Sequence, residues 1–325
     1  FQVLVGTDIK VNQTYRGPLL KTIEQIAESF KPWNPGTELT VGLFSSVVPE
    51  FDERAFREAL VNAFGHRDYS LLGRVRVLVD DAGLTIANPG GFVEGINVHN
   101  LLTAEPRGRN PCLMDALKRT GLAERTGRGI DRIFEGALNY GRPLPDYSRS
   151  NRRGVSVLLP RSVPDKAFVE LLAEERERSG KSMSLDGLLI LDKLKSERRC
   201  GFDVLSGSLD MSDQRLRTVL GQLTEAGLVE SAGVGARRTY MLGAKVYRRS
   251  GRAMEYVRQS DIDRVRYPEL IIKLMHEQKS VSKNDVMELL HLEENQAYYQ
   301  LRKLVLEGRA KKVGSGRNVR YAAVR

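Results

Sequence analysis

The sequence predicts an α+β protein in which an α/β sandwich is followed by two mainly α domains. Its 325 residues suffice for two or three domains, and 41% hydrophobic with 28% charged residues is the composition of an ordinary globular protein. Helix-like and strand-like segments are mixed in the first half, whereas the second half repeats one helix-rich pattern. The expected domains cover residues 1–163, 164–247 and 248–325.

Apolar residues at helical spacing and alternating apolar residues define the elements of the first domain. The predicted helices are Pro18–Phe30, Phe51–Phe64, Asn110–Thr120 and Gly129–Tyr140, and the predicted strands are Val75–Val79, Leu84–Ala87 and Val155–Leu159. The chain opens with Phe1-Gln-Val-Leu-Val5, which lacks an initiator Met and predicts another strand. We therefore expect a longer protein upstream.

A weak internal repeat of about 80 residues follows, with the order helix, helix, helix, hairpin in each copy. The first copy comprises Leu185–Lys195, Phe202–Leu209, Asp213–Ala226, Leu228–Ser231 and Arg238–Leu242, and the second comprises Pro268–Gln278, Lys283–Leu290, Glu294–Glu307, Ala310–Val313 and Val319–Ala322. This order is typical of winged helix-turn-helix domains, in which the third helix reads DNA and the hairpin is the wing.

Charge and cysteine content narrow the function classes. The formal net charge is +10, and most of the excess lies after residue 163, which favours a polyanionic partner such as nucleic acid. Cys112 and Cys200 lack paired-ligand spacing, so neither a zinc site nor a disulfide framework is predicted. No run of 18 apolar residues is present, so we expect no membrane span and a cytoplasmic protein.

Glu58 and Asn62 form the first candidate site. A spacing of four places both side chains on one helix face. A carboxylate can take a proton from an attacking water, and an amide oxygen can coordinate the Mg²⁺ that accompanies nucleotide phosphates. Taken alone, this pair is also common on ordinary surface helices.

Two glycine-containing turns strengthen the prediction of a phosphate site. Asn88-Pro-Gly-Gly91 follows a predicted strand, and Gly127-Arg-Gly-Ile130 opens a predicted helix. Glycines allow close approach of the backbone, and free N–H groups at a helix N-terminus favour phosphate oxygens. Arg128 would add positive charge there.

These segments together resemble a known family. The resemblance rests on Arg57-Glu-Ala-Leu-Val-Asn-Ala-Phe-Gly-His-Arg-Asp-Tyr-Ser70, Ile86-Ala-Asn-Pro-Gly-Gly91, Arg109-Asn-Pro111 and Gly121-Leu-Ala-Glu-Arg-Thr-Gly-Arg-Gly-Ile130. The chain is similar to RecG-like transcriptional regulators of bacteria and archaea, which carry an ATPase domain of the gyrase, histidine kinase and MutL (GHKL, HATPase-like) superfamily. Its opening residues also resemble the stretch that follows a Schlafen-type, Alb-like nucleic-acid domain, which is absent from this sequence.

The resemblance implies roles residue by residue. Glu58 matches the catalytic general base and Asn62 the Mg²⁺ ligand, while Asn88 stands where the superfamily has the Asp that reads adenine, beside Gly90 and Gly91. The matched phosphate and adenine positions that remain are Gly127, Gly129 and Ser156. Asn in place of Asp, and a short Gly-x-Gly in place of a longer ATP lid, favour binding of ATP over its hydrolysis.

Two further motifs do not fit their usual chemistry. His66-Arg67-Asp68 is similar to a kinase catalytic loop, but Gly73 replaces the metal-binding Asn of that motif. His66 and Asp68 are instead expected to cap the helix or brace the site, with a proton shuttle at His66 as the alternative. Gly180-Lys181-Ser182 lacks the first glycine of a Walker A motif, so no helicase motor is predicted.

The repeats supply candidate DNA contacts because Asn, Gln and Arg bond base edges while Lys and Arg bind phosphates. In the first repeat they are Gln214, Arg215, Arg217, Arg237 and Arg238, and in the second they are Asn295, Gln296, Gln300, Arg302, Lys303, Lys311, Lys312, Arg317 and Arg320. Ala297, Leu301 and Leu304 are expected to form the buried face of the second recognition helix, and Ser282 to cap the helix before it.

The resulting prediction is a nucleoid-associated, homo-oligomeric transcriptional regulator that binds double-stranded DNA, ATP and Mg²⁺, with weak ATP hydrolysis left open. Two alternatives stay open as well. The first domain can serve as a non-enzymatic scaffold or dimerisation platform with a degenerate nucleotide site, or the protein can be an RNA-directed Schlafen-like factor.

Overall fold

The computed structural model describes residues 1–41, 44–123, 127–232, 238–249, 267–290, 294–314 and 319–324. Contacts divide the chain into two compact units, Phe1–Leu189 and Ile190–Arg325. The boundary falls within helix α6 (Leu185–Glu197). Each unit combines helices with strands, so the chain is of the mixed α and β kind that the sequence predicts.

A five-stranded mixed sheet forms the centre of the first unit, with strand order β2-β1-β5-β6-β7. Its strands are β1 (Gln2–Val5), β2 (Asp8–Asn12), β5 (Arg76–Asp80), β6 (Gly83–Pro89) and β7 (Gly154–Pro160). β1 and β5 pair in parallel and all other neighbours pair in antiparallel fashion. The β6–β7 register sets Asn88 opposite Val155, so both residues lie at one end of the sheet.

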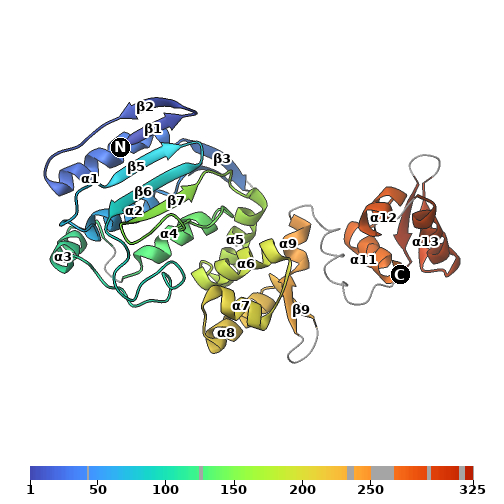
Figure 1. The fold of residues 1–325 in the computed structure, drawn as a ribbon. Helices are drawn as coiled ribbons and strands as arrows, with labels where there is room; N and C mark the ends of the chain where they lie inside the picture. Colours follow the sequence, from blue (N-terminus) through green and yellow to red (C-terminus); the bar gives the residue numbers. More distant parts are fainter. Residues whose placement is uncertain are drawn as a thin grey trace. The chain divides into compact units, whose positions relative to one another are not determined.

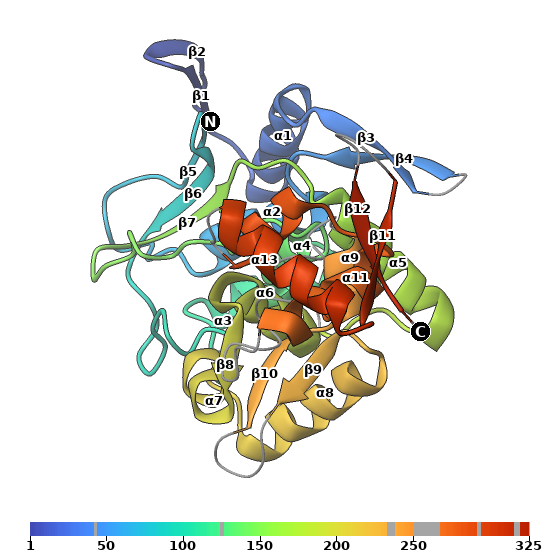
Figure 2. The same cartoon turned by 90° about the vertical axis from the view of Figure 1, so that its right-hand side faces the viewer.

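Helices cover one face of this sheet (Figures 1 and 2). They include α1 (Leu19–Phe30), α2 (Glu53–Gly65) and α4 (Gly129–Leu138). α2 starts where Asp52 accepts hydrogen bonds from the backbone of Arg54 and Ala55, both at 2.9 Å. α2 and α4 approach closely at Gly136, where a Cβ would lie 2.7 Å from the Cβ of Ala55.

Several elements of this unit were not expected from the sequence. A hairpin of β3 (Gly36–Val41) and β4 (Phe44–Pro49) stands apart from the main sheet, although Pro35 and Gly36 indicated only a break. α3 (Pro111–Arg119) matches its predicted helix, whereas α5 (Lys166–Ser179) was not predicted. α5 ends at Gly180, whose φ of +71° is the left-handed conformation of a helix cap.

The first repeat contains three helices and a three-stranded sheet. Its elements are α6, β8 (Arg199–Gly201), α7 (Phe202–Leu209), α8 (Asp213–Glu225), β9 (Val229–Ala232) and β10 (Thr239–Leu242), followed by α9 (Ala244–Arg249). The strand order is β8-β10-β9. The short strand β8, placed between the first two helices, is absent from the sequence prediction.

The second repeat has the same plan. It comprises α11 (Tyr267–Gln278), α12 (Lys283–Leu290), α13 (Glu294–Leu306), β11 (Ala310–Val313) and β12 (Arg320–Ala323). Val281 precedes α12 and forms an antiparallel bridge with Tyr321 of β12, as β8 pairs with β10 in the first repeat. The predicted Ser282 cap is present, since its hydroxyl accepts from the Asp285 backbone at 3.2 Å.

Ala297, Leu301 and Leu304 of α13 are fully buried, as their spacing predicts. None of the helices in the described part of the chain combines the length and apolar character that crossing a bilayer requires.

Candidate functional site

One face of α2 lines a cavity of about 330 Å³ in the first unit. This face carries polar side chains at intervals of four residues: Glu58, Asn62 and His66. The small side chains of Ala59 and Ala63 between them leave room for the cavity. Only 2% of Glu58 is exposed. Glu58 is therefore shielded from bulk solvent where it lines the cavity.

The sheet supplies the second wall through Ile86 and Asn88 of β6 and Val155 and Val157 of β7. Asn88 is buried, and its amide nitrogen donates to the carbonyl oxygens of Pro89 at 3.0 Å and Gly90 at 3.5 Å. Both donor hydrogens are thereby directed to the backbone. The amide oxygen is left as the acceptor that Asn88 can offer to a ligand amino group.

The N-terminus of α4 closes the cavity beside α2. A Cβ on Gly129 would lie 2.9 Å from Oε2 of Glu58, and 3.6 and 3.8 Å from the amide nitrogen and oxygen of Asn62. The absent side chain therefore leaves a small cradle between the carboxylate, the amide and the start of the helix. The first N–H groups of a helix have no intrahelical acceptor, which makes this cradle suitable for phosphate oxygens.

The structure thus brings together segments that are far apart in the sequence. Six of the predicted nucleotide-site residues line this one cavity: Glu58, Asn62, Asn88, Gly91, Gly127 and Gly129. Gly127 has a φ of +76°, and a Cβ there would lie 2.9 Å from Cγ of Pro106. This glycine therefore permits both the turn and the close packing of the segment that precedes α4.

Three other predicted residues lie elsewhere, for identifiable reasons. Val155 and Val157 point into the cavity, so Ser156 between them points to the opposite sheet face. Ser156 instead exchanges backbone hydrogen bonds with the Ser150 hydroxyl at 3.0 and 3.1 Å. The predicted adenine contact of Ser156 is not supported by this placement.

Arg128 also lies away from the cavity lining. Its guanidinium pairs with Asp131 at 3.1 Å and Glu135 at 3.7 Å on its own helix, which opposes the predicted contact with phosphate. Gly90 does not line the cavity either. Its φ is +92°, and a Cβ would lie 2.6 Å from Cβ of Asp68. Gly90 therefore allows the turn to pack against the chain after α2.

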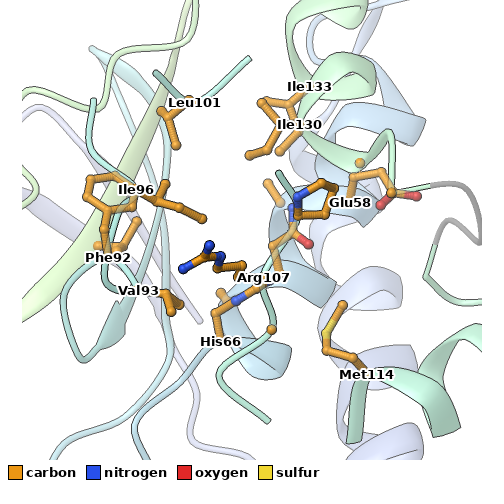
Figure 3. A pocket seen from close by; sticks show the side chains of 18 of the residues that line it. Glu58, His66, Phe92, Val93, Ile96, Leu101, Arg107, Met114, Ile130 and Ile133 are labelled. Atoms are coloured by element: carbon orange, nitrogen blue, oxygen red, sulfur yellow. The ribbon is translucent and has the colours of Figure 1, made fainter. Parts of the chain in front are cut away.

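The sequence analysis missed the segment between β6 and α4 that forms the outer wall. Its cavity-lining members include Phe92, Val93, Ile96, Leu101, Leu102, Arg107, Met114 and Lys118. Figure 3 shows Phe92, Val93, Ile96 and Leu101 across the cavity from Ile130 and Ile133, with Arg107 near them. The residues before α3 lie outside every predicted helix and strand, whereas Met114 and Lys118 share one face of the predicted helix at α3, which was not assigned to the site. The wall combines an apolar surface with the cations Arg107 and Lys118 and the carboxylates Glu105 and Asp115.

Arg109 holds three parts of the site in place. It donates through Nε to the His66 carbonyl at 3.1 Å and through Nη2 to the Gly91 carbonyl at 2.7 Å, and its Nη1 lies 3.5 Å from Asp68. Asn110 adds bonds to the carbonyls of Gly65 and Arg67, at 2.9 and 2.8 Å. The end of α2 and the turn after β6 are therefore fixed relative to each other.

Asp68 contacts Arg109 and Ser70, in keeping with its predicted bracing role, whereas His66 lines the cavity and contributes its backbone carbonyl to Arg109. Burial first, and then the charge of Arg109, lowers the pKa of His66 below its ordinary value. His66 is consequently neutral near pH 7. Hydrogen bonds from Ser70 lower the pKa of Asp68, whose Oδ1 accepts from the Ser70 backbone at 2.9 Å.

No cluster of three or more His, Cys, Asp or Glu side chains suited to a metal is present among the described residues. One amide at Asn62 and one carboxylate at Glu58, next to the Gly129 cradle, fit an Mg²⁺ that arrives with phosphates and keeps its other ligands from them.

In the first repeat, the predicted DNA-contacting side chains Gln214, Arg215, Arg217 and Arg238 are exposed. The guanidinium of Arg217 lies 4.3 Å from the ring centre of Phe202 and 3.9 Å from Asp213. It is therefore held against its own domain. Arg237 lies outside the described residues.

In the second repeat, Asn295, Arg302, Lys303, Lys311 and Lys312 are exposed, and Gln300 is half-buried. Arg317 and the side chain of Gln296 lie outside what the structure describes. Arg320 differs from the prediction of a free wing cation. It donates to the Ser280 hydroxyl and carbonyl at 2.9 and 2.8 Å and lies 3.3 Å from Asp285, so it fastens the wing to the helices.

Comparison with known proteins bears on the first unit. Residues 73–159 match the family model described as "Putative ATP-dependent DNA helicase recG C-terminal". The match includes Asn88, Gly91, Gly127 and Gly129, and it begins after α2. This region is therefore similar to the domain that the model describes, and that similarity agrees with a site for ATP and Mg²⁺. The comparison with curated proteins found no match.

Among solved structures, the chain is similar to the DIP2311 protein from Corynebacterium diphtheriae. The TM-score is 0.62 at 21% identity, over 99% of this chain and 58% of that one. The chain therefore spans little more than half of that protein, and the likeness concerns the fold alone. The mRNA-binding domain of elongation factor SelB from E. coli covers 44% of this chain at 14% identity and a TM-score of 0.18, which is too low to indicate a shared fold.

Proposed function

We propose that the first unit binds ATP with Mg²⁺ and that the two C-terminal repeats are winged helix-turn-helix domains that bind double-stranded DNA. The protein is then a transcriptional regulator, in a homo-oligomeric assembly, whose DNA binding responds to ATP. One observation carries the nucleotide part of the proposal. Glu58 and Asn62, Asn88 and Gly91, and Gly127 and Gly129 come from three separate segments and line one cavity.

The cavity divides into an apolar part and a polar part that suit the two ends of ATP. Ile86, Val155 and Val157 offer a flat apolar surface for a purine, beside the Asn88 oxygen that can accept from its amino group. The start of α4 and the Gly129 cradle are suited to the phosphates. Bound Mg²⁺ would offset part of the phosphate charge next to the Glu58 carboxylate.

Glu58 is the residue placed to act as a general base for hydrolysis. Its carboxylate lies at the start of α4, where the helix dipole favours negative charge. ATP binding does not require that role, so the two activities are separable by substitution. Glu58→Gln keeps the shape and removes the base, whereas Asn62→Ala removes the amide that would hold Mg²⁺.

The DNA part of the proposal rests on topology and exposed charge. Both repeats share the order helix, strand or bridge, helix, helix, hairpin, with the element before the second helix paired to the last strand. Lys311 and Lys312 on the wing and Arg302 and Lys303 on α13 are exposed. Exposed cations on a wing and a third helix are suited to phosphates of a duplex.

Calorimetric titration with Mg-ATP tests the nucleotide role. The parent chain and Glu58→Gln are expected to bind ATP, and Asn62→Ala to bind at least tenfold more weakly, a loss of about 1.4 kcal/mol. Asn139→Ala is the matched control, because this amide is exposed at the C-cap of α4 and does not line the cavity. It should bind like the parent.

Equal affinity in the parent and Asn62→Ala, or no ATP binding by the parent, would leave the first unit as a scaffold. The DNA role is measured separately, from the anisotropy of a labelled duplex with and without Mg-ATP. An unchanged duplex affinity when Mg-ATP is added would contradict the proposed response to ATP.

A further inference from the structure

A second cavity in the first unit, of about 830 Å³, has an unusual charge pattern. It is framed by residues 12–17 after β2, by the end of α2, and by residues 73–77 that lead into and begin β5. Four arginines line it, Arg16, Arg67, Arg74 and Arg76, and none of its lining residues is Asp or Glu. This cavity is distinct from the candidate ATP site, whose lining contains several carboxylates.

Within the part of the chain that the structure describes, these arginines form no close ion pairs. Among the described residues, none of the four lies within 4.0 Å of a carboxylate oxygen, whereas Arg161, Arg132 and Arg109 of the same unit have such partners. Cations that are gathered at one cavity produce a positive potential that attracts anions. The arrangement therefore indicates an anionic ligand.

Neutral partners orient these side chains without neutralising them. Arg67 donates through Nη2 to the Gly73 carbonyl at 2.8 Å, and its buried Nε has no partner in the described structure. Arg74 donates to the Thr14 hydroxyl at 3.1 Å, and Arg76 to the Gln2 amide oxygen at 3.4 Å. Each guanidinium keeps further N–H groups for a ligand, and guanidinium geometry matches phosphate.

Aromatic rings accompany the arginines. The guanidinium of Arg67 lies 4.6 Å from the ring centre of Tyr69, which is 48% exposed. The Tyr15 hydroxyl hydrogen-bonds to Ser29 at 2.5 Å, so its ring is held at the cavity by its own hydroxyl. Arginines that follow a phosphate backbone, next to rings on which bases stack, are the features of single-strand binding.

We propose that this arginine-lined cavity binds a single-stranded segment of nucleic acid. The strand's phosphates lie among Arg16, Arg74 and Arg76, and a base stacks against Tyr69. The proposal is independent of ATP binding and of the winged-helix surfaces, since it concerns other residues.

Fluorescence anisotropy with a labelled oligothymidylate of about ten nucleotides tests it. The triple variant Arg16→Gln/Arg74→Gln/Arg76→Gln is compared with the parent between about 50 and 200 mM salt. Each lost phosphate contact lowers the slope of log affinity against log salt by about 0.7 for a single strand, so the slope should fall by about 2. Arg67 is left unchanged because it adjoins His66 of the ATP cavity.

A matched triple variant, Arg119→Gln/Arg149→Gln/Arg152→Gln, removes the same charge from exposed positions that line neither cavity. It should keep the parent slope. If the cavity variant also keeps that slope, or if both variants lose it equally, the proposal is wrong. Inorganic polyphosphate that binds the parent as tightly as the oligonucleotide would overturn it too, since bases would then contribute nothing.

A second measurement requires no substitution. An oligonucleotide that carries 5-iodouridine is irradiated with the parent chain, and the cross-linked peptides are identified by mass spectrometry. Cross-links are expected at Tyr69, and their confinement to the C-terminal repeats would refute the cavity as the site. The affinities of the cavity variant for ATP and for duplex DNA should equal the parent values. These two affinities test the proposed function, and the oligonucleotide measurements test the cavity, so the two proposals can fail independently.

Discussion

Replacement of Gly129 by Ala separates the chemistry of the candidate ATP site from the stability of the fold. Gly129 starts α4 in an ordinary helical conformation, since it is not among the glycines with positive φ. The added methyl would lie 2.9 Å from Oε2 of Glu58 and 3.6 Å from the Asn62 amide nitrogen. It occupies the cradle in which we place phosphate and Mg²⁺.

The surroundings of that methyl set the expected changes in Mg-ATP affinity and in stability. Glu58 is 2% exposed, so its carboxylate cannot swing into solvent to restore an ordinary contact. Loss of the cradle should weaken Mg-ATP binding at least tenfold, or by about 1.4 kcal/mol. Alanine is the better helix former by up to about 1 kcal/mol. This gain offsets only part of the overpacking cost of a methyl 2.9 Å from a carboxylate that cannot move away, so the free energy of unfolding should fall by up to about 2 kcal/mol.

Calorimetric titration with Mg-ATP and urea unfolding measure the two effects on the same samples. Gly136→Ala is the control on the same helix, where a Cβ would lie 2.7 Å from the Ala55 Cβ and 2.9 Å from the Asp52 Cβ. It should lose about 1–3 kcal/mol of stability by overpacking and keep its ATP affinity while folded. Parent-like ATP binding by Gly129→Ala would refute the assignment of the cradle to phosphate.

Three further predictions concern other parts of the molecule. The fold lowers the pKa of His66, so as pH falls below about 6.5 the unfolded state takes up a proton before the folded state does. The free energy of unfolding should then fall by at most about 1.4 kcal/mol per pH unit. His66→Gln should reduce this pH dependence, as measured by urea unfolding at a series of pH values. Arg109→Lys keeps the charge but cannot reproduce the bonds to the two carbonyls, so about 1–3 kcal/mol of stability should be lost by thermal or urea unfolding, and a parent-like midpoint would argue against the bracing role. In the second repeat, Lys311→Gln/Lys312→Gln should lower the slope of log duplex affinity against log salt by about 2. Arg320→Gln should instead lower the melting temperature and leave that slope nearly unchanged. Similar slopes in the two variants would contradict the different roles given to these cations.

Features that depend on local periodicity could be predicted from the sequence alone. Glu58 and Asn62 share a helix face because four residues make about one turn, and the cavity confirms that they lie together. The same reasoning placed Ala297, Leu301 and Leu304 in a core, where all three are buried.

Strand alternation was equally informative, although it was not applied to Ser156. Val155 and Val157 face the cavity, so their neighbour must face away from it. Local context also decides the role of Gly180-Lys181-Ser182. A Walker A loop follows a strand and opens a helix, whereas Gly180 caps the end of α5 in a left-handed conformation.

The sequence by itself therefore determined which residues share a helix face or a strand face, and where the chain must turn, because those properties depend on neighbours a few positions away. Only the tertiary structure decided which faces meet. It fastened Arg320 to Ser280 and grouped the four arginines of the second cavity. Each of these outcomes depends on the distance between charges and on the shape of the enclosed space, which arise only when segments far apart in the chain pack against one another.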